Sequence, residues 1–176
     1  MICATRCLGS FVMALCLCAI APAQQASTTA PVSSEDQAAL QRLAEEFYAA
    51  YAQEDLTRFV NVWSRRSPER EAARTRMQQQ FDSYEQIAVQ QVEVRRADRV
   101  GERVKALLAI EVSAIDAKTK KPPAGFGKTL RVMECVKEDG AWRVWRFVPA
   151  VDDLAATLAG LKSDEERWRA VAAALA

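Results

Sequence analysis

Four side chains in this 176-residue sequence have the chemistry of a ligand site. Tyr48, Tyr51 and Trp63 each combine an apolar ring with one polar group. Arg131 adds a positive charge within a predicted strand. Together these residue types suit the binding of a small, largely apolar ligand in a cleft. The alternative is that the three aromatic residues are ordinary core residues and that Arg131 lies on a solvated sheet face, as Glu111 and Ser113 can.

The residue types needed for most acid–base and metal chemistry are missing. The sequence has no histidine, which excludes Ser-His-Asp and Cys-His triads and histidine-ligated metals. It also has no glycine-rich phosphate loop, CxxC pair or carboxylate cluster with metal spacing. We therefore expect no catalytic residues, no metal and no cofactor. Cys135 is expected to be a small buried apolar residue rather than a redox thiol.

The first 23 residues have the pattern of a signal peptide. Arg6 precedes an apolar run over residues 8–20, and cleavage is predicted after Ala23. The run is too short for a membrane span, which needs about 20 apolar residues. We expect an exported protein, periplasmic or secreted, with no stable membrane anchor after cleavage. A lipoprotein is the alternative, but Leu17 before Cys18 disfavours it.

The composition fits one globular domain, because half of the residues are hydrophobic and 27% are charged. Without the signal peptide, 23 basic residues balance 23 acidic ones. A neutral chain gives no case for a nucleic-acid partner. One basic cluster is interpreted as a solvated helix face, partly neutralised by Glu69 and Glu71; it comprises Arg65, Arg66, Arg70, Arg74 and Arg76.

Three helices are predicted in the first half of the chain. Residues 24–33 are polar and proline-containing and are expected to form a flexible leader without structure. A helix should begin at Ser34, which caps it. Asp55 caps a second, short helix, and Ser67 with Pro68 opens a third.

In the second half of the chain, apolar and polar residues alternate with a period of two. Strands are predicted over 84–96, 103–116, 126–138 and 141–148, with the last two joined by an Asp-Gly turn at residues 139–140. A polar turn containing Asp98 separates the first two. Two short helices follow, the second capped by Ser163 with Glu166.

The last predicted strand is apolar on both faces. Alternation places Trp142, Val144 and Val148 on one face and Trp145 with Phe147 on the other. Large exposed apolar patches are uncommon on monomers, so both faces should be covered. The N-terminal helices can cover one face; the C-terminal helices, a second subunit or a missing domain can cover the other. We expect a homodimer formed through the sheet.

Two stretches resemble a known superfamily. They are Glu-Phe-Tyr-Ala-Ala-Tyr at 46–51, followed by Asp-Leu at 55–56 and Phe-Val-Asn-Val-Trp at 59–63, and the hairpin sequence at 137–144. Residues 34–150 are thereby similar to the nuclear transport factor 2-like superfamily, and to its polyketide-cyclase-like and ketosteroid-isomerase-like bacterial members. The resemblance implies an α+β cone: three N-terminal helices on a curved antiparallel sheet of about four strands. Two short helices form a C-terminal extension at 151–176.

The resemblance also implies a pocket between the concave sheet face and the helices. Isomerases of this superfamily place an Asp base and a Tyr-Asp pair there. Tyr51 matches a helix-one tyrosine, but Asp82, Asp98 and Asp116 do not fall mid-strand on an apolar face.

Three hypotheses for the function remain open. The first is an exported, non-catalytic domain that binds a small apolar ligand or a protein partner. The second is a cyclase- or isomerase-like enzyme that uses a Tyr and a carboxylate in the pocket. The third is an assembly domain from a truncated multidomain helical-repeat protein, because the tail from Leu154 onward resembles a helical connector.

Overall fold

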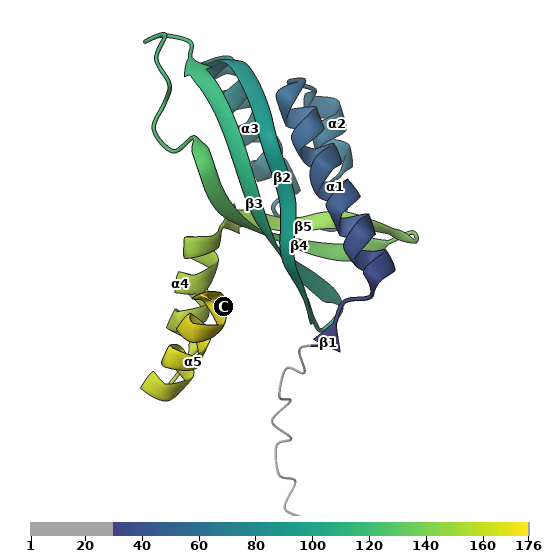
Figure 1. The fold of residues 1–176 in the computed structure, drawn as a ribbon. Coiled ribbons are helices and arrows are strands. Elements are labelled where there is room, and N and C mark those ends of the chain that lie inside the picture. Colours follow the sequence, from purple (N-terminus) through teal and green to yellow (C-terminus); the bar gives the residue numbers. More distant parts are fainter. Residues whose placement is uncertain (1–29, 176) are drawn as a thin grey trace, which may run out of the picture.

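The computed structural model of the chain describes residues 30–175, and within them it has an α+β fold. Three helices come first, a sheet follows, and two helices close the chain (Figure 1). The helices are α1 (Ser34–Ala52), α2 (Leu56–Asn61), α3 (Arg70–Ser83), α4 (Ala150–Gly160) and α5 (Asp164–Leu175). The strands are β1 (Ala30–Pro31), β2 (Tyr84–Val100), β3 (Arg103–Asp116), β4 (Gly127–Glu138) and β5 (Ala141–Pro149). The predicted signal peptide lies outside the described residues.

The sheet is antiparallel throughout, with its strands in sequence order from β1 to β5. It is open and strongly curved, so the predicted cone is confirmed, with the two-residue β1 as an addition to the four expected strands (Figure 1). Three irregularities in the β2–β3 pairing increase the local twist and bend of β2. The predicted Asp-Gly turn is confirmed, because Asp139 and Gly140 both have positive φ, 51° and 79°.

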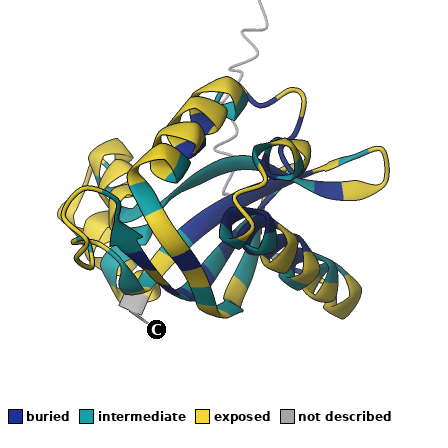
Figure 2. Cartoon of the chain, turned by 90° about the horizontal axis from the view of Figure 1, so that it is seen from above, coloured by how far each residue is buried: buried dark blue, intermediate teal, exposed yellow. Residues whose placement is uncertain are grey.

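The main core lies between the concave face of the sheet and helices α1–α3 (Figure 2). Every second residue of β3 is buried there, from Val104 to Ala114, as the period of two predicts. Leu40, Phe47 and Phe59 supply the largest buried side chains from α1 and α2. The apolar stripes of helices and strand therefore meet as their sequences indicate.

The helix starts differ in part from those predicted. Ser33, not Ser34, caps α1, its Oγ accepting the N–H of Asp36 at 3.1 Å. Asp55 caps α2 as predicted, accepting the N–H of Arg58 at 2.9 Å. The predicted start of the third helix at Ser67 is wrong, since α3 begins at Arg70. The Ser67 hydroxyl instead donates to the carbonyl of Trp145 at 2.5 Å, which fixes a turn before the helix.

The leader predicted over residues 24–33 is wrong at its end. Ala30–Pro31 pairs with Asp98 and Arg99 at the edge of β2, and Val32 is buried. Pairing with β3 carries β2 beyond residue 96 to Val100, so Asp98 lies in a strand and not in the predicted turn. Residues 24–29 lie outside the described part of the chain.

A bulge changes the faces of β5. The pairing with β4 shifts between Glu134 and Cys135, so that Trp145 is the extra residue. Phe147 consequently faces the helices together with Val144, and its ring lies 4.7 Å from that of Phe47. The predicted placement of Phe147 on the opposite face is wrong, because simple alternation cannot anticipate the extra residue.

The outer face of the sheet is covered in part by α4. Arg146 of β5 bonds to Asp153 of α4 at 2.8 Å and to Glu134 of β4 at 3.0 Å. Lys105 also contacts Asp153, at 3.0 Å. Helix α5 packs on α4, and Trp168 on it is 73% exposed. Of the three ways in which we expect the second face of β5 to be covered, the C-terminal helices therefore account for part.

Candidate functional site

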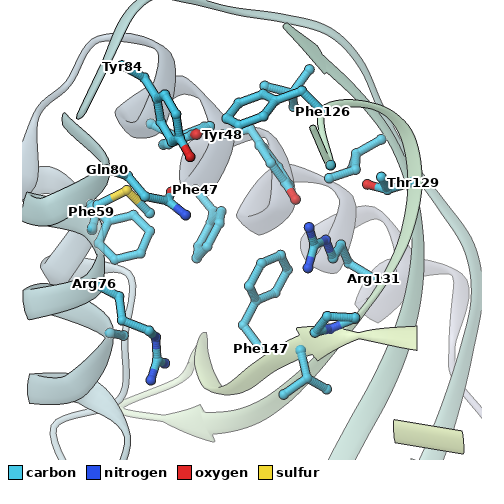
Figure 3. A pocket seen from close by; sticks show the side chains of 18 of the residues that line it. Phe47, Tyr48, Phe59, Arg76, Gln80, Tyr84, Phe126, Thr129, Arg131 and Phe147 are labelled. Atoms are coloured by element: carbon cyan, nitrogen blue, oxygen red, sulfur yellow. The ribbon is translucent and has the colours of Figure 1, made fainter. Parts of the chain in front are cut away.

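A cavity of about 770 Å³ lies between the concave sheet face and helices α1–α3 (Figure 3). Such a volume is typical of small-molecule sites. Its walls come from α1, α2, α3, the starts of β2 and β4, the middle of β3 and the end of β5. The lining residues include Phe47, Tyr48, Tyr51, Phe59, Trp63, Glu69, Arg76, Met77, Gln80, Tyr84, Ile110, Val112, Phe126, Thr129, Arg131, Arg146 and Phe147.

The structure brings all four predicted site residues together in this cavity. Tyr48 and Tyr51 come from α1, Trp63 follows α2, and Arg131 projects from β4. The three aromatic residues are also buried members of the main core, so they line the cavity and contribute to the core at the same time. Glu111 and Ser113 lie instead on the opposite sheet face, where Glu111 pairs with Lys128 at 3.8 Å and Ser113 lies 2.7 Å from the amide of Gln90.

Tyr48 carries an unusual polar group for its position. The residue is only 3% exposed, and its hydroxyl has no hydrogen-bond partner. Figure 3 shows this hydroxyl pointing toward the guanidinium of Arg131. Burial raises the pKa of Tyr48 well above its usual value, an effect that the positive charge of Arg131 partly opposes. The phenol is therefore a neutral hydrogen-bond donor at any physiological pH.

A second phenol stands beside it. The rings of Tyr48 and Tyr51 lie 6.4 Å apart, in an edge-to-face arrangement. Burial is the largest influence on Tyr51 and raises its pKa to about 12, again against the charge of Arg131. Both hydroxyls can donate a hydrogen bond, and neither can act as a base near neutral pH. The indole Nε1 of Trp63 is also buried without a partner.

Five further aromatic residues line the cavity. Phe47 contacts both Phe59, at 4.8 Å between ring centroids, and Phe147, at 4.7 Å. Tyr84 and Phe126 form an edge-to-face pair at 5.0 Å on another side of the cavity. These rings offer a large apolar surface with fixed geometry.

The charged groups of the cavity are mostly cationic. Arg76, Arg131 and Arg146 line it, and Glu69 is the one carboxylate among the described lining residues. Glu69 lies 3.7 Å from Arg146, so its charge is already balanced. Arg76 is exposed, as the prediction of a solvated helix face requires, and it also lines the cavity, which the sequence did not indicate.

The aspartates considered from the sequence lie away from the cavity lining. Asp82 accepts a bond from Gln78 on the exposed side of α3, and Asp98 pairs with Arg96 at 2.9 Å. Asp116 accepts the backbone N–H groups of Lys118 and Thr119, which hold its pKa below the usual value. None of these three aspartates can transfer a proton to a molecule in the cavity.

The structure also bears on thiol chemistry, metal binding and membrane insertion. Cys135 is buried, and burial raises its thiol pKa, as expected for a small core residue. Within residues 30–175 no group of three His, Cys, Asp or Glu side chains is arranged to hold a metal ion. Over the same range, no helix has the length and apolar character needed to cross a bilayer.

Comparison with known proteins identifies the fold. The chain is similar in structure to a candidate aromatic ring hydroxylase from Novosphingobium aromaticivorans, with a TM-score of 0.51 and 12% identity over 66% of this chain and 88% of the other. It is also similar to Aln2 from a Streptomyces species, with a TM-score of 0.50 and 14% identity over 73% and 99%. A ketosteroid isomerase-like protein from Erwinia carotovora atroseptica matches with a TM-score of 0.48 and 12% identity over 65% and 95%.

No family model matches the chain, and no curated protein matches it in sequence. At these identities the structural matches establish the fold alone. The chain has the α+β cone fold that the resemblance implies, so the resemblance drawn from the sequence is confirmed at the level of the fold.

Proposed function

We propose that this protein is an exported domain that binds a small, largely apolar ligand in the cavity without transforming it. The observation that carries the proposal is the cavity itself, about 770 Å³ with eight aromatic residues among those that line it. Sites for small molecules have this form: an apolar hollow with a few polar groups that orient the ligand. Export rests on the signal-peptide pattern alone, and recovery of the tagged protein only from the cytoplasm would contradict it.

The charge arrangement supports binding rather than catalysis. General acid–base catalysis needs a base near the reacting atom with a pKa near the working pH. The pKa values of Tyr48 and Tyr51 are raised far above that range, and Glu69 is engaged by Arg146. A cyclase- or isomerase-like enzyme would have to use Glu69 as its base. Loss of a measured turnover in Glu69→Gln would favour that alternative.

The experiment is to fill the cavity from one side. Thr129 lies in β4 and faces the cavity, while its neighbour Lys128 is exposed on the opposite face. We expect the neutral dye N-phenyl-1-naphthylamine to bind the protein with enhanced fluorescence. Thr129→Trp should weaken this binding at least about tenfold, because the indole occupies the ligand volume. Lys128→Trp, the matched control, should bind as the parent does.

Two results would overturn the proposal. One is absence of dye binding at millimolar concentration to the folded protein. The other is equal loss of binding in Thr129→Trp and Lys128→Trp, since this would place the dye outside the cavity.

Assembly is a second candidate function, favoured by the C-terminal helices. Trp168 on α5 and Val151 on α4 are 73% and 69% exposed, and neither helix has a buried side chain among its described residues. Exposed large apolar groups mark contact surfaces when they gather. Equal behaviour of the parent and Trp168→Ser in pull-down and sedimentation experiments would count against a role of this surface.

A further inference from the structure

The cavity contains a cation without a protein counter-ion. Arg131 projects from β4 into the space between the hydroxyl of Tyr48 and the ring of Phe147 (Figure 3). Among the described residues no carboxylate lies within ion-pairing distance of it. Arg146, in contrast, contacts three carboxylates, those of Glu69, Glu134 and Asp153.

The environment of Arg131 makes this free charge costly. The side chain is half-buried, and the rings around it give little compensation for lost hydration. The one carboxylate in the cavity lining, Glu69, is bound to Arg146 instead. The cavity therefore has an excess of positive charge in an apolar setting, which an anionic ligand group would balance.

An unused hydrogen-bond donor lies beside the guanidinium. The Tyr48 hydroxyl is buried, has no partner and points toward Arg131. As a neutral phenol it can donate to the oxygen of an anion held by the arginine. The oxygen is covered in this conformation, so a small rotation of the ring accompanies the contact.

We propose that the ligand of this cavity is a monocarboxylate with an aromatic or alicyclic body, its carboxylate held by Arg131 and Tyr48. This inference rests on the proposed function and adds the chemical class of the ligand. A guanidinium presents two parallel N–H groups that match the two oxygens of a carboxylate. The apolar body would then lie against Phe47, Phe147 and the Tyr84–Phe126 pair.

A matched pair of probes tests the charge directly. 2-Naphthoate and 2-naphthamide have the same ring system and nearly the same size, and differ in the charge of the polar group. We expect isothermal titration calorimetry to give a Kd for 2-naphthoate about fivefold lower than that for the amide, since a hydrogen bond to a charged group is stronger than one between neutral groups.

Variants assign the preference to its residue. Arg131→Met should remove the preference for the acid and leave the affinity for the amide within about twofold, and Arg131→Lys should retain part of it. Tyr48→Phe should weaken acid binding a few-fold. Arg42→Met removes a charge from the exposed side of α1 and should change nothing. Binding of N-phenyl-1-naphthylamine by each variant verifies that its cavity is intact.

The outcomes separate this inference from the proposed function. Equal affinity of the parent for acid and amide overturns the inference and leaves the apolar cavity as a binding site. A preference for the acid that persists in Arg131→Met also overturns it. If the neutral dye binds and neither naphthyl probe does, the inference about the carboxylate fails and the proposed binding function stands. If neither the dye nor the probes bind, both proposals fail.

Discussion

At the level of single residues, the cavity is distinguished by individual polar atoms that are buried without hydrogen-bond partners. The hydroxyl of Tyr48 and the Nε1 of Trp63 are buried without hydrogen-bond partners, and both residues line the cavity. A buried hydroxyl without a hydrogen bond costs about 1–3 kcal/mol. The folded protein bears this cost at two residues that line the cavity. A bound ligand can explain such buried polar atoms, because it can supply the missing hydrogen-bond partners.

The cost can be measured by removing one atom. Tyr48→Phe deletes the orphaned hydroxyl, so the free energy of unfolding of the ligand-free protein should rise by about 1 kcal/mol. Tyr51→Phe is the matched control, because the Tyr51 oxygen is not among the buried orphaned atoms; its stability should stay within about 0.5 kcal/mol. Urea unfolding of the three proteins measures the difference. A loss of more than about 1 kcal/mol in Tyr48→Phe would show that the hydroxyl has a partner.

The site residues could be predicted only in part, for reasons visible in the chain. Tyr48, Tyr51 and Trp63 lie on helical stripes, and such stripes face the core. Arg131 is a charged residue between Leu130 and Val132 in a predicted strand, which is a local signal. Arg76 gives no such signal, since it belongs to a run of charged residues that looks solvated. Its place depends on the angle at which α3 meets the sheet.

At the scale of elements, the first turn of α1 is tied to the far end of the sheet. Asp36 accepts a hydrogen bond from the indole of Trp142 in β5 at 2.9 Å. Lys137 and Arg99 lie 3.5 and 3.4 Å from the same carboxylate. One side chain thus connects the N-terminal helix with β2, β4 and β5.

This connection should make stability depend on pH. The bond from Trp142, followed by the nearby charges, holds the pKa of Asp36 below its ordinary value of 3.8. The unfolded chain then takes up the proton at a higher pH than the folded protein does. Stability from Asp36 is therefore present above about pH 4 and is lost as the pH falls through the folded-state pKa.

The prediction is tested with Asp36→Asn. We expect the drop in urea midpoint between pH 6 and pH 3 to be smaller in this variant than in the parent, because the titrating group is gone. The midpoint at pH 6 should itself be lower, since the charge that faces Lys137 and Arg99 is lost. A variant that keeps the full acid-induced drop would contradict the role given to Asp36.

Elements with strong local signals follow the sequence, and those shaped by tertiary contacts do not. β3 begins and ends at the predicted residues, because its alternation is unbroken. The Asp-Gly turn and the Ser163–Glu166 capping box are also confirmed. The bulge at Trp145 reversed the faces expected for the end of β5, since one inserted residue leaves no mark in a periodic pattern. The two-residue β1 is likewise too short to give a pattern.

For the whole molecule, curvature is what makes room for a ligand. The cavity lies between the concave face of the bent sheet and helices α1–α3 (Figure 3). Dimer formation through the outer face of the sheet stays a prediction. That face carries Leu130, which is 52% exposed, beside the part covered by α4. A single monomeric species in sedimentation equilibrium at high concentration would contradict it.

The most direct test of the account is to locate a bound ligand by methyl NMR. On titration with 2-naphthoate, we expect the largest shifts at Ile110, Val112 and Met77, whose side chains line the cavity. The chemical shifts of methyl groups on the outer face, those of Leu130 and Val136, should not change. Saturable binding with shifts confined to the cavity would support the central claim. Shifts confined to the outer face, or none in a folded protein at millimolar ligand, would contradict it.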